Sequence, residues 1–224
     1  FGISTKEKPD QNIKVIIKEA EDNMYRSKLL ERKSISSSII SSLERTLWEK
    51  SHETEEHAKR LKRIAIKLGN TINLPESKLD ELSLLSTLHD IGKIAIPEGI
   101  LLKKDKLTKN EWKVIKRHPE IGYNIAASSF QIKHIAEAIL THHECWDGSG
   151  YPQGLKGEDI PITARIINII DAYDVMTHDR HYRKAISEEE AIEEIKRCAG
   201  TQFEPKLVDK FIEIINEMSI KTKS

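Results

Sequence analysis

Residues 161–177 read PITARIINIIDAYDVMT, and this stretch indicates the kind of fold that the chain adopts. Pro161 suits the start of a helix, and the isoleucines that follow it cover more than one helical face. A helix that is apolar nearly all round belongs in the core of its domain. Asp171 lies midway along it, where an unpaired carboxylate is costly. A bound metal ion would account for this acid, and so would a salt bridge.

Helical signals continue on both sides of this core segment. Leu82, Leu85 and Leu88 share one face of a helix that we expect to end near Gly92. Two capping-box pairs mark the starts of further helices: Thr108 with Glu111, and Ser187 with Glu190. No alternating strand pattern appears after residue 50, so the main domain, residues 51–224, is predicted to be all-α.

The first 50 residues differ from the rest. Residues 1–33 hold a short apolar start, a charged turn and an amphipathic stretch from about Ile13 to Leu30. Residues 34–50 begin serine-rich, yet apolar residues recur there every four positions, at Ile35, Ile39, Leu43 and Leu47. This spacing predicts a connecting helix that runs into the main domain.

Composition excludes several classes of protein. The 36 Lys and Arg residues balance the 36 Asp and Glu residues, which argues against binding a nucleic-acid polymer through bulk charge. No apolar run approaches the roughly 20 residues that cross a membrane, and no signal peptide is visible. Cys145 and Cys198 form no disulfide framework. We therefore predict a cytoplasmic protein with no membrane segment in this chain, and leave open a membrane or sensor segment upstream of Phe1.

Histidines and acids recur in contexts that suit metal binding. Imidazole and carboxylate are ligands for iron, manganese, zinc and nickel, and a carboxylate can bridge two ions. Each short motif alone also has an ordinary explanation, such as a solvated helix face or a core hydrogen bond, but five in one chain favour a metal centre. The candidate ligands are Glu53, His57, His89, Asp90, His118, His142, His143 and Asp171. We assign the other histidines to the surface or to supporting positions.

Residues 142–152, HHECWDGSGYP, resemble the HHE-x-x-DG-x-GYP loop of HD-GYP phosphodiesterases, a subgroup of the HD superfamily of metal-dependent phosphohydrolases. Further segments match in order over about residues 39–216: ETEEH at 53–57, LHDIGKIAIP at 88–97, HPEIG at 118–122 and IIDAYDVMT at 169–177. The resemblance implies an all-α helical bundle of the HD superfamily.

The resemblance also implies roles for particular residues. Seven of the candidate ligands match metal ligands of the family, and Glu53 occupies the place of the glutamate that members with three metals add. Asp90 and Lys93 would act in catalysis, with Lys93 on a substrate phosphate. The remaining substrate contacts would come from the tight loop and from the basic segment after the last ligand: Asp147, Gly150, Tyr151, Arg180 and Arg183.

The implied reaction is hydrolysis of cyclic di-GMP to pGpG or GMP by a metal-bridging hydroxide. The implied cofactors are two or three divalent transition-metal ions, iron or manganese first, with zinc or nickel as alternatives. Two other hypotheses stay open. The chain could bind a cyclic dinucleotide or a partner without turnover, or it could hydrolyse cyclic GMP-AMP or pGpG instead.

The N-terminal region resembles a different family. FGIST at 1–5 and IKEAEDNMYRSK at 17–28 look like the last strand and last helix of a GGDEF domain. The GGDEF signature is missing from this chain, so we predict a remnant, a strand plus a helix over residues 1–33, without cyclase activity. A GGDEF-domain protein is a candidate partner, and the 34–50 helix is a candidate homodimer contact.

Overall fold

The computed structural model describes residues 3–5, 12–51, 54–179 and 184–222. It divides into two compact units, Phe1–Leu43 and Glu44–Ser224, and we describe each by itself. Helix α1 (Ile13–Lys50) begins in the first unit, and its last residues, from Glu44 onward, belong to the second.

The first unit is formed mainly by α1. The Asn12 side chain accepts a hydrogen bond from the Lys14 main-chain N–H at 2.9 Å, as an N-terminal cap does. Residues 3–5 are irregular, so the strand predicted at the N-terminus is not seen among the described residues. A strand needs a neighbouring strand to pair its main-chain groups, and the described part of this unit provides none. The GGDEF remnant stays a prediction.

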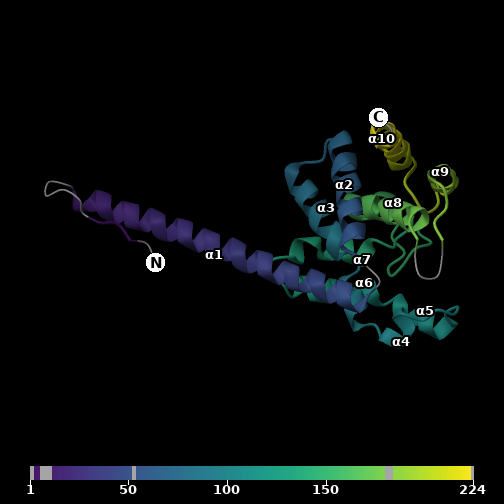
Figure 1. The fold of residues 1–224 in the computed structure, drawn as a ribbon, viewed down its shortest axis with the longest axis horizontal. Coiled ribbons are helices and arrows are strands. Elements are labelled where there is room, and N and C mark those ends of the chain that lie inside the picture. The colour runs from purple at the N-terminus through teal and green to yellow at the C-terminus, as the bar shows by residue number, and fades with distance from the viewer. Residues whose placement is uncertain (1–2, 6–11, 52–53, 180–183, 223–224) are drawn as a thin grey trace. The chain divides into compact units, whose positions relative to one another are not determined.

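Three helices form the core of the second unit. Helices α2 (Glu55–Thr71) and α3 (Glu76–Leu88) pack against each other, and α8 (Ile162–Thr177) packs against both (Figure 1). Four isoleucines of α8 are completely buried: Ile166, Ile167, Ile169 and Ile170. The prediction of a helix enclosed in the core is confirmed, with Pro161 at its N-cap.

A second group of short helices lies against this core. Helix α6 (His118–Ala127) packs against the 3₁₀ helix η1 (Ile91–Ala95) and against α7 (Ala136–Thr141), which contacts α3 and α8. Helix α3 ends at Leu88 rather than near Gly92, because the chain there tightens into η1. A Cβ atom on Gly92 would lie 1.9 Å from the His118 carbonyl oxygen, so the close approach of η1 and α6 requires glycine.

The remaining elements of the second unit are α4 (Glu98–Leu101), α5 (Lys109–Ile115), η2 (Lys133–Ile135), η3 (Gly157–Asp159), α9 (Glu188–Arg197) and α10 (Pro205–Thr222). Both predicted capping boxes are formed, at Thr108 before α5 and at Ser187 before α9. The described residues contain no strand beyond an isolated bridge between Ala199 and Phe203, which confirms the all-α prediction. No helix in the described ranges has the length and apolar character of a membrane span.

Candidate metal centre

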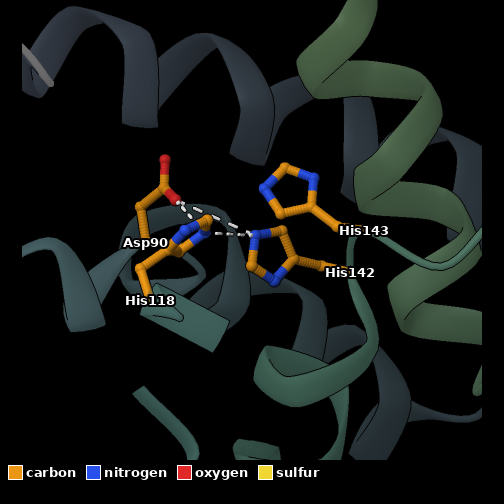
Figure 2. A group of neighbouring side chains, drawn as sticks. All are labelled: Asp90, His118, His142 and His143. Carbon is orange, nitrogen blue, oxygen red and sulfur yellow. Dashed lines mark hydrogen bonds and ion pairs between the residues drawn. The ribbon is translucent and has the colours of Figure 1, made fainter. Parts of the chain in front are cut away.

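Four of the predicted ligands meet in the interior of the second unit. One ligand atom from each of Asp90, His118, His142 and His143 lies within 4.8 Å of the others, and Figure 2 shows the four side chains turned toward one another. The His118 Nε2 atom lies 3.0 Å from Asp90 Oδ1 and 3.3 Å from His142 Nε2. Residues up to 53 positions apart in sequence therefore converge at one point.

Helix ends bring these side chains together. His118 is the first residue of α6, and His142 is the C-cap residue of α7. Asp90 directly follows His89, the C-cap residue of α3. The contacts of α6 with η1 and α7, and of α7 with α3, draw these ends toward one another. The packing of the bundle therefore determines where the ligands lie.

Main-chain carbonyl groups orient two of the imidazole rings. The Nδ1 atom of His118 lies 2.8 Å from the Ile115 carbonyl oxygen, and Nδ1 of His142 lies 2.6 Å from that of Ile139. A carbonyl oxygen only accepts, so Nδ1 carries the hydrogen in both rings. Each Nε2 atom then offers its lone pair to the centre, which is the usual arrangement of a metal-binding histidine.

A second group of ligand atoms lies beside the first. It comprises His57, His89 and Asp171, whose ligand atoms also lie within 4.8 Å of one another. The Nε2 atom of His57 is 3.5 Å from Asp171 Oδ1. The side chain of Asp171 has 23% of its surface exposed, so it is not enclosed in the apolar core.

Asp90 is a buried member of the first group that also contacts the second group. Its Oδ2 atom is 3.3 Å from His89 Nε2 and 2.6 Å from Lys93 Nζ. Burial alone would raise the pKa of Asp90, but the Lys93 charge and the surrounding histidines outweigh it and hold the pKa well below its usual value. Asp90 is therefore a carboxylate at neutral pH, as a metal ligand must be.

The histidine pair is kept neutral. Burial lowers the pKa of His142, and burial together with the neighbouring His142 and His118 lowers the pKa of His143 further. A neutral imidazole is the form that binds a metal ion. At neutral pH these two rings would release no proton on binding.

The loop that follows the pair is held from inside by Glu144. Its buried carboxylate accepts hydrogen bonds from three consecutive main-chain N–H groups, those of residues 153, 154 and 155, at 2.7 to 3.1 Å. Tyr151 stacks on His143 with ring centres 4.9 Å apart, and Lys116 Nζ lies 4.7 Å from the centre of the Tyr151 ring. The loop therefore presents an aromatic ring beside the ligands, and Lys116, the C-cap residue of α5, places a cation over that ring.

Two other predicted substrate residues, Asp147 and Gly150, lie in the same loop. Asp147 is exposed and accepts a hydrogen bond from the Ser149 main-chain N–H at 2.8 Å. Gly150 packs so tightly that an added Cβ would lie 2.3 Å from the Cys145 nitrogen. Cys145 itself is a half-buried free thiol.

Three predicted residues, Glu53, Arg180 and Arg183, lie outside the described residues. Helix α2 begins at Glu55, with the extended residue Thr54 as its N-cap.

Sequence reasoning missed three residues that support the site: Arg60, Glu144 and Asp174. Asp174 follows Asp171 by three residues, and it is Asp174 that forms the buried salt bridge, with Arg60 Nε at 2.6 Å. The signal was available, since the argument that an acid in an apolar helix needs a partner applied to both aspartates. Glu144 was visible as the third residue of HHE, but nothing in the sequence showed which groups it accepts from.

The residues present fit divalent transition metals. The donors are imidazole nitrogens and carboxylate oxygens, mostly buried, with no thiolate among the described ligand atoms. The rings of His118 and His142 are oriented by hydrogen bonds at Nδ1, which leaves Nε2 for the metal ion. The donor set suits iron, manganese, zinc and nickel alike, so it does not select one metal.

Comparison with known proteins gives consistent results. A family model described as HD domain matches residues 41–207. The 3'3'-cGAMP-specific phosphodiesterase 2 of Vibrio cholerae is 37% identical over 187 residues, 83% of this chain and 36% of that protein. A cyclic di-GMP phosphodiesterase of Thermotoga maritima is 38% identical over 169 residues, 75% of this chain and 46% of that protein. The chain thus spans less than half the length of these relatives.

A solved structure has the same fold. The crystal structure of a cyclic GMP-AMP specific phosphodiesterase of V. cholerae, V-cGAP3, superposes with a TM-score of 0.60 at 22% identity. The match covers 80% of this chain and 48% of that one.

Proposed function

Because this chain belongs to the HD domain family, we propose that it is a metal-dependent phosphodiesterase of the HD-GYP type, with cyclic di-GMP as its first candidate substrate. The convergence of two adjacent groups of ligand atoms, built from residues 57 to 171, is the observation that carries this proposal. The relatives named as cyclic dinucleotide phosphodiesterases give the substrate class.

The ligands for the ions would be the described members of the two groups: His57, His89, Asp90, His118, His142, His143 and Asp171. Bound divalent ions would lower the pKa of water and neutralise charge on a phosphate. Iron or manganese are our first candidates, with zinc or nickel as alternatives. A third ion held with the help of Glu53 stays part of the proposal.

Lys93 would stabilise charge in the reaction. Its ammonium group is 2.6 Å from Asp90 and its side chain is 20% exposed, so it can hold Asp90 as a carboxylate and also contact a ligand that arrives from solvent. A positive group placed beside a phosphate stabilises the negative charge that develops during hydrolysis. Lys93 would serve as an electrostatic clamp and not as a proton acceptor.

Tyr151 would bind substrate as a hydrogen-bond donor. Burial raises the pKa of its hydroxyl, so the group keeps its proton over the whole physiological range. Its ring, stacked on His143, is placed beside the ligands. Arg180, Arg183, Asp147 and Gly150 complete the proposed substrate contacts.

Purified protein supplied with Mn²⁺ or Fe²⁺ is expected to convert cyclic di-GMP to pGpG or GMP, as followed by chromatography of the products. His89→Ala and Asp90→Ala should abolish turnover, whereas His134→Ala should not, because His134 is exposed on η2. Full activity after removal of all metal would contradict the proposal.

Two alternatives remain open to the same assay. The relative from V. cholerae named for 3'3'-cGAMP favours a test of cyclic GMP-AMP beside cyclic di-GMP and pGpG, and the highest kcat/KM identifies the substrate. Tight binding of all three compounds without turnover, over several metals, would favour a non-catalytic binding module.

The proposal also covers the N-terminal region. We propose residues 1–33 as the end of a GGDEF domain, and the exposure of Ile13, Val15 and Ile17 on α1 agrees with a surface that a larger domain would cover. A GGDEF-domain partner, a homodimer through residues 34–50 and a cytoplasmic location complete the proposal. The two free cysteines suit that location.

A further inference from the structure

A buried ion pair lies directly behind one of the metal-binding histidines. Asp174 of α8 has a side chain that is 1% exposed, and its carboxylate lies between His57 and Arg60 of α2. Asp174 Oδ2 is 2.6 Å from His57 Nδ1. Arg60 donates from Nε to Oδ1 at 2.6 Å and from Nη2 to Oδ2 at 2.8 Å, a two-pronged contact.

The two aspartates of α8 therefore face different partners. Asp171 Oδ1 lies on the Nε2 side of His57, within the ligand group. Asp174 lies on the Nδ1 side, and both of its oxygens already accept hydrogen bonds from Arg60. Asp174 is thus placed to hold His57 rather than to bind an ion.

His57 depends on a side chain for its orientation, which distinguishes it from His118 and His142. Those two rings donate to main-chain carbonyl oxygens three residues earlier, which no substitution removes. His57 lies in the first turn of α2, and its Nδ1 atom meets the Asp174 carboxylate instead.

The hydrogen bonds of Asp174 agree with this role. Arg60 donates to both oxygens of the carboxylate, so Asp174 is held as an acceptor. A carboxylate accepts only, so His57 Nδ1 carries the hydrogen and Nε2 offers its lone pair toward Asp171 and His89. An acceptor behind a histidine also makes the ring a stronger ligand.

We propose that Asp174 is the positioning residue for His57 and that Arg60 fixes Asp174 in place, so that this pair determines metal affinity at the His57–His89–Asp171 group. The inference rests on the proposed function, since it assumes that this group binds an ion. Removing such a partner typically weakens metal binding or activity by about 10–100-fold.

The test measures binding of Mn²⁺ alone to the metal-free full chain by calorimetry, together with the thermal unfolding temperature. Asp174→Asn keeps the size of the side chain but turns an amide N–H toward a donor. The double variant Arg60→Met/Asp174→Leu removes the ion pair altogether, and apolar replacement of a buried ion pair commonly preserves stability. Both variants should lose about 10–100-fold in Mn²⁺ affinity at the His57–His89–Asp171 group. They should keep wild-type affinity at the group that contains Asp90 and His118.

Glu81→Gln is the matched control. Glu81 is also a buried acid that contacts α8, through Thr163 Oγ1 at 2.6 Å, and it pairs with Lys78. It lies outside both ligand groups, so its loss should leave Mn²⁺ affinity within about twofold of wild type, far from the 10–100-fold expected for Asp174.

The outcomes separate a positioning role from a structural one. A double variant with wild-type unfolding temperature and wild-type Mn²⁺ affinity would overturn the inference. If the double variant does not fold, Asp174→Asn decides, because its affinity must fall further than that of Glu81→Gln. Wild-type protein that binds none of Mn²⁺, Fe²⁺, Zn²⁺ and Ni²⁺ would instead overturn the proposed function itself.

Discussion

Replacing Gly92 by alanine should disable the site without touching any ligand. The added Cβ would lie 1.9 Å from the His118 carbonyl oxygen and 2.6 Å from the Gly122 nitrogen, whereas Cβ contacts under 3.0 Å essentially never occur. Both obstacles are main-chain atoms of α6, so no side chain can move aside. Helix α6 must withdraw from η1 by about 1 Å, and a misplacement of that size can cost about 100-fold in rate.

The cost in stability follows from the same clash. Overpacking a well-packed interior costs about 1–3 kcal/mol, and a main-chain obstacle favours the upper end of that range. For a chain of this size, about 3 kcal/mol lowers the unfolding temperature by about 6–12 °C. We therefore expect Gly92→Ala to remain folded at room temperature, with a clearly lower Tm and about one-hundredth of the wild-type kcat/KM.

Gly99→Ala provides the matched control. Gly99 is exposed on α4, and an added Cβ would meet nothing within 4 Å. Alanine in a helix is better than glycine there by about 0.4–1 kcal/mol, so this variant should keep full activity and gain slightly in Tm. Calorimetry and steady-state hydrolysis of cyclic di-GMP measure both variants. Wild-type Tm and activity in Gly92→Ala would refute the argument from close packing.

Three further perturbations test separate parts of the site. Lys93→Met should lower kcat by about 10²–10³-fold in the hydrolysis assay, as loss of one charge-stabilising group does, and an unchanged kcat would remove Lys93 from the mechanism. Glu144→Gln should destabilise the chain by about 1–3 kcal/mol in urea unfolding and raise KM, because three main-chain N–H groups lose a charged acceptor. A variant as stable as wild type would contradict this expectation. Burial lowers the pKa of His142 and His143, so the unfolded chain binds more protons than the folded one below about pH 6.5, and the metal-free protein should lose stability as the pH falls from there. A Tm that stays constant between pH 7 and pH 5 would show that these rings are not buried as neutral groups.

Local signals in the sequence predicted the helices well. The apolar run of α8 and the capping boxes at Thr108 and Ser187 depend on residues within a few positions of one another, and all were confirmed. The end of α3 was predicted four residues late, because a contact with α6, distant in sequence, tightens the chain into η1. Propensity describes a segment, whereas this boundary depends on packing between segments.

The candidate ligands were also visible in the sequence, but their partners were not. The structure brings seven of the eight together, and Glu53 lies outside the described residues. The role of Asp174 could not be assigned, because His57 and Arg60 lie more than a hundred positions away in the chain. Burial suggested that an acid in α8 needs a partner. Only the packing of α2 on α8 shows that Asp174 is the acid paired with Arg60 and that Asp171 lies in the ligand group.

His89 and Asp90 are consecutive residues, yet they contribute to different ligand groups. A single peptide unit therefore couples the two halves of the centre, and a shift of the chain there displaces a donor in each. A substitution that moves the main chain at this peptide unit, without replacing either residue, should therefore weaken ion binding in both groups at once.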